Sequence, residues 1–245
     1  MEAARQPARR INVGDVINET FSIYGSNAAE LIVSALVVFV IVGLLAGLLQ
    51  NSGGFIVVLL AAMIRLAGSA LYTGFVVKLV EDVRDGRRDE TVGDLFSAAA
   101  PAILSLTAFA ILFGIGVAIG LVLLIVPGLI LITFWALGPP AIVVEGAGPL
   151  DAFGRSWRLV TGNAWSVFGA LVVALLIAIA IGIVLGVIGA AIGAGATIVA
   201  SILASAITAP IFALAVSVMY FDLAGGRAGA AAAAPPPAPP TTPAA

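Results

Sequence analysis

The chain has 245 residues, of which 62% are hydrophobic and 10% are charged. A soluble domain has about 45–50% apolar and about 25% charged residues, so this composition excludes an ordinary soluble globular protein. The sequence contains no cysteine and no histidine, which excludes disulfides, thiol chemistry, histidine bases and histidine-ligated zinc. The formal net charge is −2. We expect no metal, no cofactor and no nucleic-acid partner.

Long runs without charge predict membrane spans. Residues 95–144 and 159–221 contain no Asp, Glu, Lys or Arg. A bilayer-crossing helix needs roughly 20 apolar residues, so each run is long enough for two crossings. Turn-forming residues at 51–54, 127–128 and 189–197 divide the apolar sequence further. The six predicted spans are residues 29–50, 55–80, 101–126, 128–144, 165–190 and 197–221. We therefore expect an all-α polytopic protein with six transmembrane helices, embedded in a lipid bilayer.

The basic residues predict the orientation of the spans. With six crossings, every Lys and Arg except Arg65 lies on one side of the membrane. These residues are Arg5, Arg9, Arg10, Lys78, Arg84, Arg87, Arg88, Arg155, Arg158 and Arg227. The positive-inside rule then places both termini in the cytoplasm. Because the basic residues are nearly all Arg and the chain is rich in Ala and Gly, we expect a bacterial plasma membrane.

A short polar stretch precedes each pair of spans. The stretches around Asp15 and Asp151 align without gaps, and residues 91–101 form a weaker copy. We interpret the chain as three repeats, each a short amphipathic interfacial helix followed by a hairpin of two spans. The predicted divisions are a cytoplasmic segment (1–11), a membrane domain (12–223) with repeats at about 12–80, 91–144 and 150–221, and a disordered Ala/Pro-rich cytoplasmic tail (224–245).

The amphipathic stretches contain candidate lipid contacts. Phe21, Tyr24 and Trp157 are expected to enter the headgroup region, while Arg155 and Arg158 stay in water. These helices either fix where each hairpin enters the membrane or hold anionic lipid, to which each basic residue contributes about 1 kcal/mol. We favour anchoring, because acidic residues are interleaved with the arginines of the loop between the second and third spans.

Arg65 is the one charge expected deep inside the bilayer. It lies about 16 Å along its helix from Gly54, near the membrane midplane. A charge there costs at least about 2.5–3.5 kcal/mol, so we expect Arg65 to face the protein interior and to have a partner. Pro139 and Pro140 break the fourth span and free backbone carbonyls, which either accept hydrogen bonds from Arg65 or mark a substrate path. Glu145, near the cytoplasmic interface, completes this candidate polar site.

Nearly the whole sequence, up to about residue 226, resembles a known family. The residues that carry the resemblance are Pro127, Gly128, Trp135, Pro140, Glu145, Ser156, Leu159, Tyr220 and Asp222. Together they resemble the membrane domain of glycerophosphoryl diester phosphodiesterases and its stand-alone bacterial relatives. The resemblance implies that hydrolysis belongs to a separate domain with metal-binding carboxylates and histidines. Because this chain has no histidine, we expect no phosphodiesterase activity from it.

Two functions remain open from the sequence. The first is a non-enzymatic scaffold or accessory protein that organises lipids, or a cytoplasmic or membrane protein partner, at the cytoplasmic face. The second is a small transporter or lipid-handling permease that uses Arg65 and the Pro139–Pro140 break. A transporter of this kind usually has matched broken helices in corresponding repeats, and only one predicted hairpin has a Pro-Pro break. Oligomeric state and cargo are not encoded in any motif of the sequence.

Overall fold

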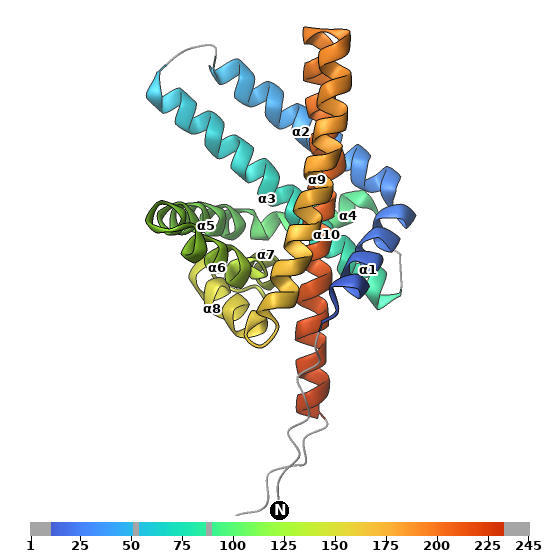
Figure 1. Ribbon diagram of the computed structural model, residues 1–245, viewed down its shortest axis with the longest axis vertical. Coiled ribbons are helices and arrows are strands. Elements are labelled where there is room, and N and C mark those ends of the chain that lie inside the picture. Colours follow the sequence, from blue (N-terminus) through green and yellow to red (C-terminus); the bar gives the residue numbers. More distant parts are fainter. Residues whose placement is uncertain (1–10, 51–53, 87–89, 233–245) are drawn as a thin grey trace, which may run out of the picture.

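The computed structural model describes residues 11–50, 54–86 and 90–232, which form helices joined by short connections (Figure 1). No strand occurs in these three ranges, so the described residues confirm the all-α class. The predictions for residues 1–10, for Arg87 and Arg88, and for the tail beyond residue 232 lie outside the described residues.

Eleven helical elements follow one another along the described chain. They are α1 (Val13–Ser26), α2 (Ala28–Gln50), α3 (Phe55–Asp85), α4 (Val92–Ala99), the 3-10 turn η1 (Ala100–Ala102), α5 (Ile103–Leu123), α6 (Ile125–Trp135), α7 (Gly138–Glu145), α8 (Pro149–Val160), α9 (Ala164–Ile192) and α10 (Ala194–Ala232). Helix α10 continues past residue 223, where the sequence predicted a disordered tail. The extension is rich in alanine, which has the strongest intrinsic helix propensity.

Six segments are long and apolar enough to cross a membrane, as the sequence predicted. They are Ala28–Leu49, Phe55–Asp85, Val92–Leu123, Ile125–Glu145, Ala164–Ile192 and Gly195–Gly225. Helices α2 and α3 pack together, as do α5 and α6, and α9 and α10. Each of these packed pairs of chain neighbours is called a hairpin below, and their arrangement as membrane-crossing hairpins remains a prediction.

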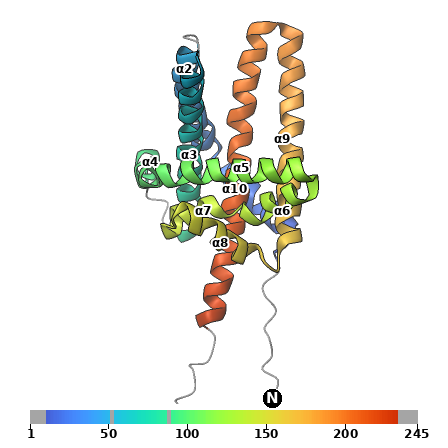
Figure 2. The same ribbon diagram turned by 90° about the vertical axis from the view of Figure 1, so that its left-hand side faces the viewer.

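The three hairpins do not stand side by side. The α2–α3 and α9–α10 hairpins rise on the same side of the molecule and diverge toward their turns (Figure 1). The α5–α6 hairpin instead lies across the direction of α9 and α10 (Figure 2). The extended backbone of Leu124 and the interruption at Ala136 and Leu137 limit α6 to 11 residues. That length is about 16 Å, roughly half the thickness of a bilayer's hydrocarbon core.

A short helix precedes each hairpin, at the positions that the repeats predicted. Helix α1 begins at Asn12, whose side-chain oxygen accepts a hydrogen bond from the Gly14 N–H at 2.9 Å. Helix α4 begins with a capping box between Thr91 and Asp94, and α8 begins with Pro149 in its first turn. Helix α1 packs on α9 and α10, α4 on α3, and α8 on α6 and α7. Their location at a membrane interface remains a prediction.

The largest buried side chains belong to an apolar cluster that includes residues of α1, α2, α3 and α10. Tyr72, Phe75 and Tyr220 are each at most 2% exposed and belong to the same apolar cluster. The Tyr72 hydroxyl donates a hydrogen bond to the Leu31 carbonyl at 3.0 Å, which joins α3 to α2. Nearer the hairpin turns the exposed side chains are large and apolar, and Phe55 is 83% exposed. Lipid, rather than water, is the solvent that such a surface requires.

Candidate functional site

The helix break before Pro139 and Pro140 is held by a serine. Helix α6 ends at Trp135 and α7 begins at Gly138. The fully buried Ser156 hydroxyl, from α8, donates to the Phe134 carbonyl at 2.7 Å and accepts from the Leu137 N–H at 3.0 Å. From the sequence, the carbonyls freed near Pro139 and Pro140 either accept hydrogen bonds from Arg65 or mark a substrate path. In the structure α8 brings Ser156, and not Arg65, to the Phe134 carbonyl.

Glu145 pairs with α8 and α10. The Nε of Arg155 donates to both carboxylate oxygens of Glu145 at 2.8 Å, and Arg155 Nη2 lies 2.7 Å from Oε1. The hydroxyl of the buried Tyr220 donates to the same Oε1 at 2.5 Å. The hydrogen bond to Glu145 raises the pKa of Arg155 above its usual value, so the guanidinium stays charged. Glu145 therefore belongs to a joint between α7, α8 and α10, and not to a site with Arg65.

A second charged joint lies where α1, α3 and α10 meet. Arg84 Nη2 lies 2.6 Å from Glu19 Oε1 and 2.9 Å from Asp222 Oδ1. The same guanidinium lies 5.6 Å from the centre of the Phe221 ring. The sequence analysis used these charges only for topology. The acidic and basic residues that alternate around Arg84 could have indicated ion pairs in this region. They could not identify the partners, because Glu19 and Asp222 are far from Arg84 along the chain.

The predicted interfacial residues divide into two groups. Phe21 is 40% exposed on α1, and Trp157 is 43% exposed on α8, where it stacks on Phe134 with ring centres 4.2 Å apart. Tyr24 instead donates a hydrogen bond to the Ile207 carbonyl at 3.3 Å, and burial raises the pKa of its hydroxyl. Phe21 and Trp157 are thus available to a membrane, while Tyr24 joins α1 to α10.

Arg65 is exposed, contrary to the expectation that it faces the protein interior. It forms no hydrogen bond or ion pair with any residue that the structure describes. Tyr72 and Val76, seven and eleven residues later, lie on the same side of α3 and are buried. Arg65 is nearer than Tyr72 and Val76 to the start of α3, and so to the α2–α3 turn. The α2–α3 and α9–α10 hairpins diverge toward their turns (Figure 1). The divergence explains why a side of α3 that is packed near Val76 is open at Arg65.

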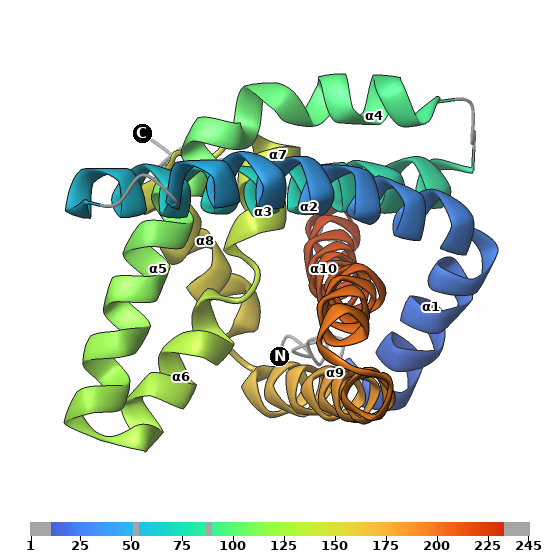
Figure 3. The same cartoon turned by 90° about the horizontal axis from the view of Figure 1, so that it is seen from above.

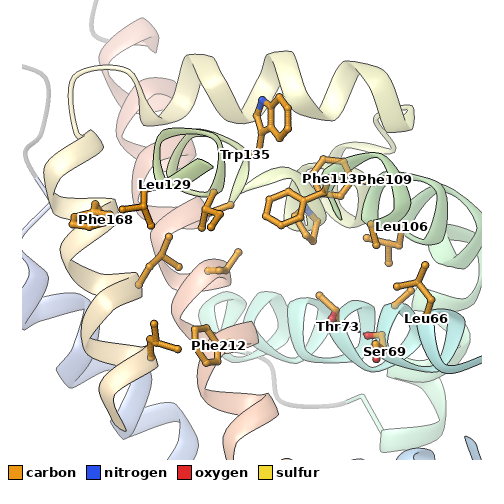
Figure 4. A pocket seen from close by; sticks show the side chains of 18 of the residues that line it. Leu66, Ser69, Thr73, Leu106, Phe109, Phe113, Leu129, Trp135, Phe168 and Phe212 are labelled. Atoms are coloured by element: carbon orange, nitrogen blue, oxygen red, sulfur yellow. Dashed lines mark hydrogen bonds between the residues drawn. The ribbon is translucent and has the colours of Figure 1, made fainter. Parts of the chain in front are cut away.

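A cavity of about 490 Å³ lies among the three hairpins. It is lined by Leu66, Ser69, Ala70, Thr73, Leu106, Phe109, Ala110, Phe113, Leu129, Ile132, Trp135, Ala136, Pro139, Phe168, Leu171, Val172, Leu175, Phe212 and Val216. Figure 4 shows Phe109, Phe113 and Trp135 on one side of this space and Ser69 and Thr73 of α3 on the other. The lining contains no charged side chain. Pro139 lines the cavity, whereas Arg65 and Pro140 do not.

The cavity is surrounded by long helices and has short helices beneath it. Seen from above, α3, α5, α6, α9 and α10 surround the region (Figure 3), and α7 and α8 lie below α5 (Figure 2). Gly138 permits α5 and α7 to approach, because a Cβ at this position would overlap the Phe109 ring. The charged joints of Arg155 and Arg84 are made by this lower part of the molecule, away from the hairpin turns. In the described ranges, no three acidic side chains converge in a way that could hold a metal ion.

The fold and the site define a multi-pass α-helical membrane protein with an apolar cavity between its hairpins. The chain belongs to the uncharacterised protein family UPF0259, whose model matches residues 49–220. It is similar to the UPF0259 membrane protein PC1_1998 of Pectobacterium carotovorum subsp. carotovorum (strain PC1), with 32% identity over 108 residues. The matched part is 44% of this chain and 43% of that relative, so the chain spans less than half of the relative's length. No solved structure matches.

The family assignment corrects the resemblance to glycerophosphoryl diester phosphodiesterases. The matching family is UPF0259, and no domain of those enzymes is indicated. The residues behind the resemblance are mostly small, apolar or helix-breaking. Unrelated membrane hairpins share such residues, because lipid and close helix packing impose the same requirements on all of them.

Proposed function

We propose that this chain is a non-enzymatic membrane protein that binds lipid, with an acyl chain in the cavity among its hairpins. The observation that carries the proposal is the lining of that cavity, to which all three hairpins contribute apolar and aromatic side chains. Small-molecule sites typically have volumes of about 300–1,000 Å³ and place a few polar groups among apolar walls. Ser69 and Thr73 are the hydroxyl-bearing residues of this lining.

The size of the cavity favours a single chain. Its volume of about 490 Å³ lies in the lower half of the range of about 300–1,000 Å³ that is typical of small-molecule sites. The space is therefore suited to one acyl chain rather than to a whole two-chain lipid. A lipid with two chains would leave the second chain in the surrounding bilayer.

The lower part of the molecule supports a role in organising lipid at the cytoplasmic face. The charged joints centred on Arg84 and Arg155 connect α1, α3, α7, α8 and α10. The exposed aromatic rings of Phe21 and Trp157 lie on the short helices α1 and α8. Under the positive-inside rule this part of the protein faces the cytoplasm of a bacterial cell, with both termini on that side. The short helices then anchor the cavity at the inner leaflet.

A lipid-handling permease is the second candidate. Pro139, at the helix break, lines the cavity, and Arg65 lies on α3 one residue before the lining residue Leu66. The α2–α3 and α9–α10 hairpins, which both contribute to the cavity lining, diverge toward their turns (Figure 1). Transport requires a second conformation that opens toward the cytoplasm, and α7, α8 and their ion pairs are the elements that would have to move.

Filling the cavity tests the proposal. Ala110 lines the cavity, whereas Ala118 lies on the same helix with an exposed side chain. We expect Ala110→Trp to remove most of the lipid that co-purifies with the protein in mild detergent, as measured by native mass spectrometry. Ala118→Trp adds the same indole outside the cavity and is expected to leave the bound lipid unchanged. Equal lipid content in both variants, with both folded by circular dichroism, would contradict the proposal.

A further inference from the structure

Arg65 lacks a counter-charge at its own depth in the membrane. Residues 31–80, 95–144 and 159–221 contain no acidic side chain. Glu81, on the same helix, is roughly 24 Å from Arg65 along the axis of α3. A Cβ on Gly68 would meet Val42, which places α2 beside α3 near this point. Glu30 is roughly 18 Å from Val42 along the axis of α2.

A second copy of the chain does not supply a counter-charge for Arg65. Its spans are identical and contain no acidic residue at the corresponding depth either. A guanidinium within a bilayer needs a partner or a path to water. The remaining candidate partner is an anion of the membrane itself, because lipid always surrounds the protein.

Arg65 is next to a residue that lines the apolar cavity. The cavity-lining Ser69 is one helical turn further along α3, and residues four apart lie on the same face of a helix. Leu66, the next residue after Arg65, also lines the cavity. The exposed cation is thus a chain neighbour of the acyl-chain site.

From this juxtaposition we propose that the bound lipid is an anionic phospholipid, with its phosphate on Arg65 and one acyl chain in the cavity. This inference rests on the proposed function and adds the headgroup class. A phosphate suits this position because a guanidinium binds phosphate oxygens through two parallel N–H donors. The neighbouring walls carry no charge, so they favour a phosphate that brings an acyl chain over a free phosphate. The lipid's phosphate would then lie deeper than the phosphates of the surrounding leaflet.

The experiment compares lipid classes on purified protein reconstituted in nanodiscs made of equal parts phosphatidylglycerol and phosphatidylcholine. The protein is released into detergent, and its bound lipids are counted by native mass spectrometry. We expect the wild type to retain phosphatidylglycerol at least fivefold over phosphatidylcholine. Arg65→Gln should bring this ratio near one with the total lipid count unchanged, and Arg65→Lys should keep part of the preference. Lys78→Gln is the matched control, since it removes a cation from the cytoplasmic end of α3 and should keep the wild-type ratio.

The outcomes separate this inference from the proposed function. If Arg65→Gln keeps the preference of the wild type while Ala110→Trp loses its lipid, the headgroup assignment is wrong and the acyl-chain site stands. If Ala110→Trp keeps its lipid, the acyl-chain site is wrong. If inorganic phosphate at millimolar concentration removes the preference without releasing lipid, Arg65 binds free anions, and the lipid assignment also fails. Hydrogen exchange of each variant checks that α3 remains folded.

Discussion

The hydroxyl of Ser156 accepts a hydrogen bond from the backbone N–H of Leu137 at 3.0 Å, across the interruption between α6 and α7. The same oxygen donates to the Phe134 carbonyl on the other side of the interruption. One buried side chain therefore satisfies a donor and an acceptor that the helix break leaves without helical partners. The position of the cavity-lining residues Trp135, Ala136 and Pro139 depends on this contact.

Replacing Ser156 with alanine should destabilise the protein through this break. The change leaves a buried N–H and a buried carbonyl unsatisfied, at a cost of about 1–3 kcal/mol in the free energy of unfolding. Denaturation in detergent micelles, followed by tryptophan fluorescence, measures the effect. Ser205→Ala is the control, because that exposed hydroxyl bonds only within α10 and its loss should cost less than about 0.5 kcal/mol. Equal stabilities of the two variants would show that Ser156 does not support the break.

Tyr220→Phe tests the joint between α7, α8 and α10. The variant keeps the buried ring and loses only the hydrogen bond to Glu145. A hydrogen bond to a charged group contributes about 1.5–3 kcal/mol, so we expect a loss of this size in the free energy of unfolding. Tyr24→Phe removes a longer bond to a backbone carbonyl and should cost at most about 1 kcal/mol. A larger loss for Tyr24→Phe than for Tyr220→Phe would contradict the assignment.

The sequence predicted the apolar segments well and the polar contacts poorly. Membrane spans can be predicted from the sequence because lipid requires long apolar runs. The connection before Phe55 can be predicted because Asn and Gly concentrate there. The Ser156 contact depends on where α8 lies relative to a break 19 residues earlier. No local sequence pattern predicts where α8 lies relative to the break.

Arg65 shows a different limit of sequence reasoning. The rule that a charge within a membrane faces the protein interior assumes that neighbouring helices stay packed along their whole length. Here α2–α3 and α9–α10 diverge, so the face that is buried at Val76 is exposed at Arg65. Hydrophobic patterning does not reveal such divergence, because lipid-facing and protein-facing residues are both apolar in these helices.

Breaking the joint at Arg84 should loosen α1. Arg84→Gln removes the ion pairs to Glu19 and Asp222, which are partly exposed and contribute about 1 kcal/mol together. We expect amide hydrogen exchange across Val13–Ser26 to become roughly fivefold faster, with little change in α9. Glu19→Gln should have a similar effect, and the double variant should add little more. Unchanged exchange in α1 for both single variants would show that apolar packing alone holds this helix.

The crosswise α5–α6 hairpin predicts an unusual labelling pattern. Because the chain has no cysteine, single cysteines report position without background. We expect Phe55→Cys and Gly195→Cys, next to the turns of the two rising hairpins, to react in intact cells with a maleimide that cannot cross the membrane. Leu124→Cys, at the turn of α5–α6, should react at least tenfold more slowly, because this turn lies well below the other two turns (Figure 2). Glu90→Cys, on the side that the positive-inside rule predicts to be cytoplasmic, should react only after permeabilisation. Fast labelling at Leu124 in intact cells would mean that the third and fourth apolar segments cross the membrane upright, and the arrangement of the cavity walls would then be wrong.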